Sequence, residues 1–246
     1  MNAIPQAAAE TVAARAATLA AFYGDTGGVA LLDAMIRKEF AGGIALVSSF
    51  GTEAAVLLHM VAAVDPKTPV IFLDTGKLFG ETRRYRDELV ARLRLKDVRI
   101  VTPDATELAK RDADGTLWFT NPDACCALRK VEPLTRALEG FAAWINGRKR
   151  YQGDLRSLIP TIEAAEGRVK INPLAQWSRA EIEAYFERHE LPHHPLQADG
   201  FQSVGCIPCS ERSRPDEEAR AGRWRGLDKT ECGIHLPAPD RKTAAA

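Results

Sequence analysis

Residues 44–53 read IALVSSFGTE, and this stretch decides the fold. Its first half is apolar and includes β-branched residues, which predicts a buried strand over 44–48. Apolar residues at helical spacing follow over 52–64 and predict a helix. The turn between them supplies Gly51, hydroxyl side chains and free backbone amides at a helix N-terminus, which together favour a bound phosphate or sulfate. An ordinary strand-to-helix turn with a serine cap is the alternative.

The alternation of strands and helices continues along the chain. Further apolar runs predict strands over 70–74, 98–101, 141–145 and 169–171, and longer polar stretches predict helices over 80–93 and 178–190. The last helix opens with a capping box made of Ser178 and Glu181. Continuous apolar strands separated by helices indicate a parallel sheet covered on both faces. The predicted fold is α/β, a doubly wound, mostly parallel sheet with helices on both faces.

The chain is expected to form one structural domain with three segments. A length of 246 residues fits one large α/β domain. Residues 1–40 form an N-terminal helical segment with an alanine-rich start, and residues 41–190 form the α/β core. Residues 191–246 are rich in Gly, Pro and charge, and are expected to be a flexible tail folded over the core.

The overall charge argues against several classes of protein. Lys plus Arg and Asp plus Glu both number 33, so the formal net charge is zero, unlike that of a nucleic-acid coat or a membrane-surface protein. No apolar run approaches the roughly 20 residues of a membrane span. Residues 1–19 lack the features of a secretory signal, so a cytoplasmic location with reduced thiols is expected.

Two more loops follow predicted strands and fall at the same edge of the sheet. The second strand ends in a turn that suits a ribose or a base, formed by Leu73, Asp74, Thr75 and Gly76. The loop over 147–156 carries cations that suit a polyanion: Arg148, Lys149, Arg150 and Arg156. Ligands of an open parallel sheet bind at the carboxyl ends of its strands, so three such loops predict a nucleotide site. A plain turn and a solvated basic loop are the alternatives.

All five cysteines lie in the second half of the chain. Cys125 and Cys126 are adjacent, and Cys206 and Cys209 form a CxxC motif. Such a set can be a redox pair, a zinc site or an iron–sulfur site, and the spacing alone leaves these open. Buried packing thiols are the alternative for the adjacent pair.

The fifth cysteine, Cys232, stands apart in a polar segment, which is a poor place for a packing thiol. A reactive thiolate needs nearby positive charge. His235 and the upstream Arg220 and Arg223 could supply that charge. A free surface thiol is the alternative.

In their order along the chain, these motifs resemble the assimilatory adenylyl-sulfate reductases, relatives of the phosphoadenylyl-sulfate reductases. The resemblance covers about residues 40–236 through SSFGTE at 48–53, LDTG at 73–76, CCALRK at 125–130, CIPC at 206–209 and ECGIH at 231–235. The ECGIH motif is highly specific for this family. The cysteine pair together with CxxC separates the iron–sulfur branch of the family from the branch that lacks those four cysteines. The resemblance implies a 4Fe-4S cluster held by Cys125, Cys126, Cys206 and Cys209, rather than zinc.

The turn over residues 48–53, the phosphate loop, also resembles the pyrophosphate loop of ATP pyrophosphatases, which usually reads SGGxDS. This resemblance implies an adenine nucleotide alpha hydrolase-like, PP-loop fold. Phe50 replaces a Gly of that pattern and Ala54 replaces its last Ser. These departures argue against ATP cleavage and favour a nucleotide whose distal group is sulfate. The implied substrate-binding residues are Ser48, Ser49, Phe50, Gly51, Thr52, Glu53, Leu73, Asp74, Thr75, Gly76, Arg148, Arg150, Arg156, Arg220 and Arg223.

The resemblance implies that adenylyl sulfate is reduced to sulfite and AMP, in assimilatory sulfate reduction and cysteine biosynthesis. The Cys232 thiolate attacks the sulfate sulfur to form an S-sulfocysteine, and thioredoxin or glutaredoxin then releases sulfite. Lys130 and His235 are the other implied catalytic residues. Lys130, Arg220 and Arg223 would offset the repulsion between the thiolate and the sulfate oxygens.

Three other readings stay open. The first is a phosphoadenylyl-sulfate reductase, or a reductase of both nucleotides, because no single residue identifies a 3′-phosphate preference. An ATP-using PP-loop transferase is more distant, and the loop departures count against it. A non-enzymatic zinc module leaves Cys232 without a purpose. No nucleic-acid or membrane partner is expected, and a homo-oligomer stays open.

Overall fold

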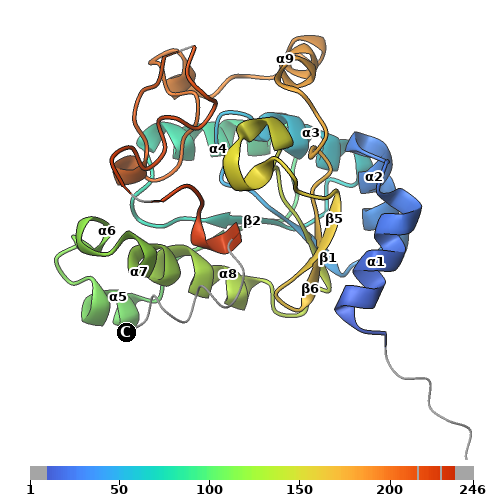
Figure 1. Cartoon of the computed structure of the whole chain (residues 1–246), viewed down its shortest axis with the longest axis horizontal. Coiled ribbons are helices and arrows are strands. Elements are labelled where there is room, and N and C mark those ends of the chain that lie inside the picture. The colour runs from blue at the N-terminus through green and yellow to red at the C-terminus, as the bar shows by residue number, and fades with distance from the viewer. Residues whose placement is uncertain (1–9, 215, 228, 236–246) are drawn as a thin grey trace, which may run out of the picture.

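The computed structural model describes residues 10–214, 216–227 and 229–235. Its centre is a six-stranded sheet with the order β3-β2-β1-β4-β6-β5 (Figure 1). Neighbouring strands are parallel except for β5 and β6. The strands are β1 Ile44–Val47, β2 Val70–Leu73, β3 Val98–Val101, β4 Ala143–Ile145, β5 Ile162–Ala165 and β6 Arg168–Ile171. The predicted fold class, a doubly wound and mostly parallel sheet, is confirmed.

The sequence pattern predicts every strand except β5, the antiparallel edge strand. β5 is joined to β6 by a turn in which Glu166 and Gly167 have φ values of 57° and 72°. Two consecutive positive φ values are typical of a tight hairpin turn. Half of β5 is alanine, which has a low preference for strands, so its pairing with β6 rather than its own composition makes it a strand.

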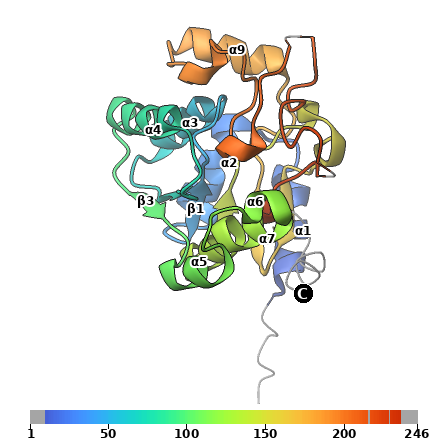
Figure 2. The ribbon, with the colours of Figure 1, turned by 90° about the vertical axis from the view of Figure 1, so that its left-hand side faces the viewer.

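Helices cover both faces of the sheet, as predicted (Figures 1 and 2). Helices α1 to α4 and α9 lie on one side, and α5 to α8 lie on the other. Their bounds are α1 Val12–Tyr23, α2 Gly28–Ala34, α3 Ala54–Val64, α4 Gly80–Arg92, α5 Ala105–Arg111, α6 Leu117–Thr120, α7 Pro122–Cys126, α8 Glu132–Ala137 and α9 Arg179–Arg188. The helices predicted over 52–64, 80–93 and 178–190 correspond to α3, α4 and α9. The alanine-rich start over 1–9 and the end of the tail over 236–246 lie outside the described residues.

The alternation of side chains along β1 divides the interior into two cores. Ile44 and Leu46 belong to the larger core, which includes residues of α3, α4 and α9. Ala45 and Val47 point to the opposite face and join Trp144 and the apolar residues of α8. All four residues of β1 are buried, which explains why the strand reads as a continuous apolar run.

The chain beyond α9 covers the carboxyl edge of the sheet. The predicted capping box starts α9, because Ser178 Oγ accepts a hydrogen bond from the Glu181 N–H at 3.2 Å and the Glu181 carboxylate accepts one from the Ser178 N–H at 2.7 Å. The following described residues form short helical turns and two isolated β-bridges, and they run past α6 and α7 (Figure 2). In the described part of the chain, no helix combines the length and the apolar character that a membrane crossing requires.

Two isoleucines in neighbouring strands test which positions carry the core. Ile71 of β2 is 0% exposed, whereas Ile100 of β3 is 53% exposed. We expect Ile71→Ala to lower the free energy of unfolding by about 2–5 kcal/mol, because it leaves a cavity in a packed core. Ile100→Ala is the matched control and is expected to change it by less than about 1 kcal/mol. Urea denaturation measures both, and equal losses would contradict the placement of β2 in the sheet interior.

Candidate active site

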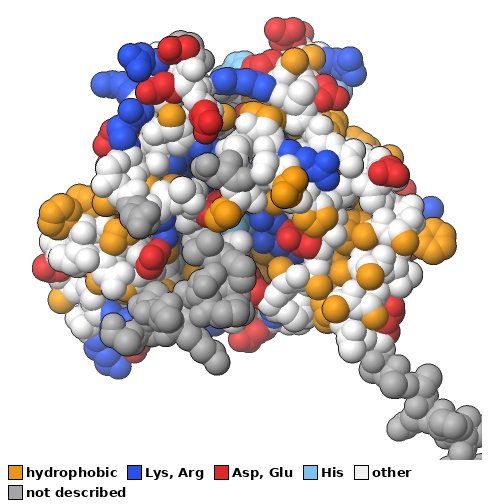
Figure 3. Space-filling view, in the orientation of Figure 1, with side chains coloured by type: hydrophobic (Ala, Val, Ile, Leu, Met, Phe, Trp, Pro, Cys, Tyr) orange, Lys and Arg blue, Asp and Glu red, His pale blue; other side chains and the backbone are white. Residues whose placement is uncertain are grey.

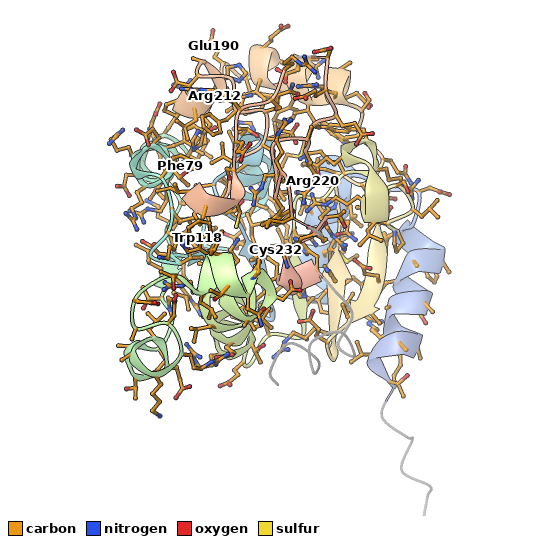
Figure 4. The ribbon with its side chains drawn as sticks, turned by 60° about the vertical axis from the view of Figure 1, so that its left-hand side comes forward. Phe79, Trp118, Glu190, Arg212, Arg220 and Cys232 are labelled. Atoms are coloured by element: carbon orange, nitrogen blue, oxygen red, sulfur yellow. The ribbon has the colours of Figure 1, made fainter. Side chains whose placement is uncertain are left out.

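One cavity of about 200 Å³, the main cavity, lies at the carboxyl ends of β1, β2 and β4. Figure 3 shows Lys, Arg and His side chains gathered in a hollow near the centre of one face of the molecule. Figure 4 labels Arg220 and Cys232, which both line the main cavity. The predicted site residues that line it are Ser48, Ser49, Gly51, Thr52, Glu53, Leu73, Lys130, Arg148, Arg156, Arg220, Arg223, Cys232 and His235. The structure therefore brings together segments that are far apart in the sequence.

Five of the predicted substrate-binding residues are not among those lining the main cavity: Phe50, Asp74, Thr75, Gly76 and Arg150. Asp74 instead accepts hydrogen bonds from Nε and Nη2 of Arg83, both at 3.0 Å. Arg150 is exposed and donates from Nε to the Ile159 carbonyl at 2.9 Å.

Phe50 shapes the phosphate loop from behind. Its φ of 49° lies in the left-handed region that favours glycine, and its N–H donates to Ser48 Oγ at 3.2 Å. Its ring is fully buried and packs edge-on against Phe72, with the centroids 5.3 Å apart. The loop therefore keeps a glycine-like backbone where pyrophosphate loops carry Gly, while the side chain joins the core.

The tail lies directly on the phosphate loop. Thr52 Oγ1 donates a hydrogen bond to the Gln202 carbonyl at 3.0 Å. A Cβ added to Gly51 would lie 3.2 Å from the Val204 carbonyl oxygen, so glycine permits this close approach. Residues 203–205 line the main cavity from the tail side.

Glu53 joins the phosphate loop to the basic loop, which is the loop over residues 147–156. Its carboxylate accepts hydrogen bonds from Lys149 Nζ at 2.6 Å, from Gln152 Nε2 at 3.0 Å and from the Tyr151 hydroxyl. Burial acts to raise the pKa of Glu53, but the charge and hydrogen bond of Lys149 outweigh it and lower the pKa. Glu53 thus fixes the position of the basic loop.

Glu231 connects the tail to two arginines of the main cavity. Its carboxylate accepts hydrogen bonds from Arg156 Nε at 2.6 Å, from Arg156 Nη2 at 2.9 Å and from Arg220 Nη2 at 3.2 Å. The N–H of Cys232 donates to the same carboxylate at 2.8 Å. Burial acts to raise the pKa of Glu231, but Arg156 and then Arg220 lower it to about 2.

Cys232 is buried, with 8% of its surface exposed. The positive charge of Lys130 acts to lower the pKa of the Cys232 thiol, whereas burial acts to raise it. The thiolate is the nucleophilic form of cysteine. Lys130 therefore favours the reactive form in this enclosed position.

The cations around Cys232 carry unneutralised charge. No carboxylate of the described residues lies within ion-pairing distance of Lys130 or Arg223. The Arg223 guanidinium lies over the Trp224 ring, 4.7 Å from its centroid, and its buried Nε has no hydrogen-bond partner. His235 stacks on Trp144, and burial, followed by the charges of neighbouring cations, holds its pKa well below its usual range. A bound anion could accept hydrogen bonds from Lys130 and Arg223 and so supply the negative charge that these two cations lack.

A second, smaller cavity, the cysteine cavity, is lined by Cys125, Cys126, Cys206 and Cys209. Asn121 caps the start of α7, because its side chain accepts a hydrogen bond from the Ala124 N–H at 3.0 Å. The two adjacent cysteines are the last residues of this short helix. The CxxC motif lies in a helical turn whose Ile207 N–H donates to the Lys77 carbonyl at 2.7 Å. The cysteine cavity lies beside the main cavity, and Lys130 lines both.

Thr75, a predicted substrate-binding residue, contacts two residues that line the cysteine cavity, Cys206 and Arg129. Its hydroxyl is 3.3 Å from Cys206 Sγ, and its carbonyl accepts a hydrogen bond from Arg129 Nη1 at 2.8 Å. Arg129 is held by a buried ion pair with Asp112, from Nε to Oδ2 at 3.1 Å. The turn after β2 therefore supports the CxxC motif.

The cysteine cavity has donors and cations that suit a sulfur-rich, negatively charged group. The four thiols share this cavity with the cations Lys77, Arg129 and Lys130, which would offset the negative charge of such a group. Trp224 packs against three cysteines, and its buried Nε1 has no partner. Within the ranges that the structure describes, no three His, Cys, Asp or Glu side chains converge on a position for a single metal ion.

Several site residues are missed by the sequence reasoning. Glu231 lies inside the quoted ECGIH motif, and its charge could have singled it out. Trp224 and residues 203–205 carry no local signal, because their place depends on how the tail folds over the loops.

The chain is similar to known proteins in both sequence and fold. A family model described as the phosphoadenosine phosphosulfate reductase domain matches residues 43–212. The adenosine 5'-phosphosulfate reductase of Mesorhizobium japonicum is 49% identical over 225 residues, which cover 92% of this chain and 89% of that protein. The phosphoadenylyl-sulfate reductase of Candida auris, solved as a phosphate complex, matches with a TM-score of 0.67 and 26% identity over 84% of this chain and 98% of that one. The FMN adenylyltransferase of Candida glabrata matches in fold alone, with a TM-score of 0.54 and 14% identity over 97% and 85% of the two chains.

The Glu53 contacts predict a pH-dependent contribution to stability. Glu53→Gln is expected to lower the free energy of unfolding at pH 7, because it leaves Lys149 buried without its charge partner. The folded pKa of Glu53 is lowered from about 4.5, so the stabilisation is present above pH 4.5 and is lost as the pH falls through the folded pKa. Urea denaturation of both proteins should show a constant difference above pH 5 that narrows below pH 4.5. A difference that widens in acid would contradict the charged state of Glu53.

Proposed function

This chain belongs to the phosphoadenosine phosphosulfate reductase family, and from that premise we propose that it reduces adenylyl sulfate to sulfite and AMP. One observation carries the proposal: the Cys232 thiol lines the same cavity as the phosphate loop and the basic residues. A nucleophilic sulfur, an anion-binding turn and unpaired cations are what the reduction of a sulfonucleotide requires.

The nucleotide would bind with its phosphate and sulfate near the phosphate loop. The amides at the start of α3 and the side chains of Ser48 and Ser49 are suited to a phosphate. Among the described residues, Lys130 and Arg223 have no carboxylate partner, so they are suited to the sulfate oxygens. Adenylyl sulfate is favoured over its 3′-phosphorylated form because the more similar of the two reductases above is named for adenosine 5'-phosphosulfate.

In the first half-reaction, the Cys232 thiolate attacks the sulfur of adenylyl sulfate. A bond forms between Sγ and the sulfate sulfur, and the bond from that sulfur to the bridging phosphate oxygen breaks. AMP leaves with the electron pair, and Cys232 becomes an S-sulfocysteine. Lys130, Arg220 and Arg223 offset the repulsion between the thiolate and the oxygens, which otherwise raises the barrier.

In the second half-reaction, a reduced dithiol protein supplies two electrons. We propose thioredoxin, with glutaredoxin as the other candidate of the same chemistry. One of its thiolates attacks Sγ of Cys232, sulfite leaves with the electron pair, and a mixed disulfide forms. The second thiol of the reducing protein then attacks that protein's own sulfur in the mixed disulfide. This step releases the Cys232 thiolate and leaves the reducing protein with an internal disulfide. The tail must open between the two steps, because Cys232 is buried.

Cys125, Cys126, Cys206 and Cys209 are the residues that would hold a 4Fe-4S cluster. The four thiols line one cavity, and such a cluster takes one thiolate at each iron rather than four at a single ion. When bound, the cluster would supply negative charge and structural support beside the main cavity. Lys130 would then stand between that charge and the substrate.

The role of Cys232 predicts the effect of its replacement. Cys232→Ser is expected to reduce sulfite production from adenylyl sulfate and thioredoxin by at least about 10³-fold, because the nucleophile is lost. Anaerobic assays measure sulfite, and calorimetry should give an AMP affinity within about twofold of the wild type. A variant that still turned over would rule out this mechanism. Faster wild-type reduction of the 3′-phosphorylated nucleotide would reassign the substrate.

The assignment of four cysteines to the cluster and of Cys232 to catalysis predicts different iron contents in two cysteine variants. Cys209→Ser is expected to lose iron and acid-labile sulfide, because it removes one ligand from the cysteine cavity. Cys232→Ser is the matched control and should keep the iron and sulfide content of the wild type. Metal analysis of anaerobically purified proteins checks both. Zinc in place of iron, or loss of iron from the control alone, would contradict the assignment.

A further inference from the structure

Glu231 occupies an unusual position beside the nucleophile. It is 4% exposed, and its carboxylate joins residues 229–235 at the end of the described tail to the loop that carries Arg156 and to Arg220, which lies earlier in the tail. The hydrogen bond to the Cys232 N–H, at 2.8 Å, makes the orientation of Cys232 depend on this carboxylate. No step of the reductase chemistry proposed above uses Glu231.

The contacts of Glu231 balance only part of the local charge. One carboxylate faces the two guanidinium groups of Arg156 and Arg220, and the same cavity is lined by Lys130 and Arg223, which have no carboxylate within ion-pairing distance among the described residues. The cavity therefore keeps an excess of positive charge while Glu231 is in place. An anionic substrate can bind without displacing it.

The tail segment, residues 229–235, is also held elsewhere. Lys229 pairs with Asp123 of α7, and His235 stacks on Trp144. Ile234 packs against the core around Trp144. Loss of the Glu231 charge should therefore loosen this segment without unfolding the protein.

We propose that Glu231 is a positioning residue that holds the tail segment closed on Arg156 and Arg220, so that the Cys232 thiol faces the bound substrate. This inference rests on the proposed function. Closure favours the first half-reaction, in which Cys232 must meet the sulfate inside the cavity. Opening favours the second, in which a protein thiol must reach the same sulfur. Glu231 should therefore speed the first half-reaction, which needs the closed tail, and should not speed the second, which needs the open tail.

The two half-reactions are measured separately with Glu231→Gln. AMP release is followed in a single turnover without reductant, and sulfite release is followed after reduced thioredoxin is mixed with pre-formed S-sulfo enzyme. We expect the first rate to fall about tenfold. The second rate should be unchanged or faster. Glu231→Asp keeps the charge and should recover part of the first rate.

Simple electrostatics predicts the opposite for the first step. Removal of a negative charge beside Cys232 should help an anionic substrate approach, so a slower first step points to lost positioning. Glu217→Gln is the matched control, because Glu217 lies on the tail outside the main cavity and pairs with Arg225 and Arg214. Both rates of that variant should equal those of the wild type.

Hydrogen–deuterium exchange gives a readout that needs no turnover. Peptides covering 229–235 should exchange faster in Glu231→Gln than in the wild type or in Glu217→Gln. Equal exchange together with an unchanged first rate would overturn the proposal, and so would an equal loss in both half-reactions. A wild-type protein that forms no S-sulfo enzyme would refute the proposed function, while the exchange data would still decide whether Glu231 holds the tail.

Discussion

A backbone contact between the tail and the turn after β2 joins the nucleotide site to the cysteine site. The Ile207 N–H donates to the Lys77 carbonyl at 2.7 Å, which attaches the CxxC segment to the turn after β2. Residues 203–205, just before that segment, consequently lie over the phosphate loop and line the main cavity. Cys206 then faces the cysteine pair at the end of α7. The nucleotide site and the cysteine site therefore share one short segment, and Lys130 borders both.

The zero net charge of the chain conceals a strongly uneven distribution. Arg148, Arg156, Arg220, Arg223 and Lys130 line one cavity, where Glu53 and Glu231 are the only acidic side chains among the described lining residues. Buried charge without a partner is unfavourable, so an anionic ligand stabilises such a site when it binds. Lys130 also supports the thiolate of Cys232, because its positive charge disfavours protonation of the sulfur. One electrostatic arrangement thus serves both substrate binding and nucleophile activation.

Much of the fold can be predicted from the sequence because strands buried on both faces produce continuous apolar runs. The edge strand β5 could not be predicted, since its formation depends on β6 and on a turn with two positive φ values. The ligand loops could be placed at one edge because parallel strands end together. Which side chains enter the cavity could not be derived, because this depends on distant partners. Asp74 is turned away by Arg83, and the contact of Glu231 with Arg156 spans 75 residues.

The central claim is that four cysteines form one set and that Cys232 alone is the nucleophile. The most direct test is peptide mapping by mass spectrometry of anaerobic wild-type protein mixed with adenylyl sulfate in the absence of reductant. A mass gain of one SO₃ group on the peptide that contains Cys232, released by reduced thioredoxin, is the predicted result. The same gain on a peptide containing Cys125, Cys126, Cys206 or Cys209, or on none, would contradict the account.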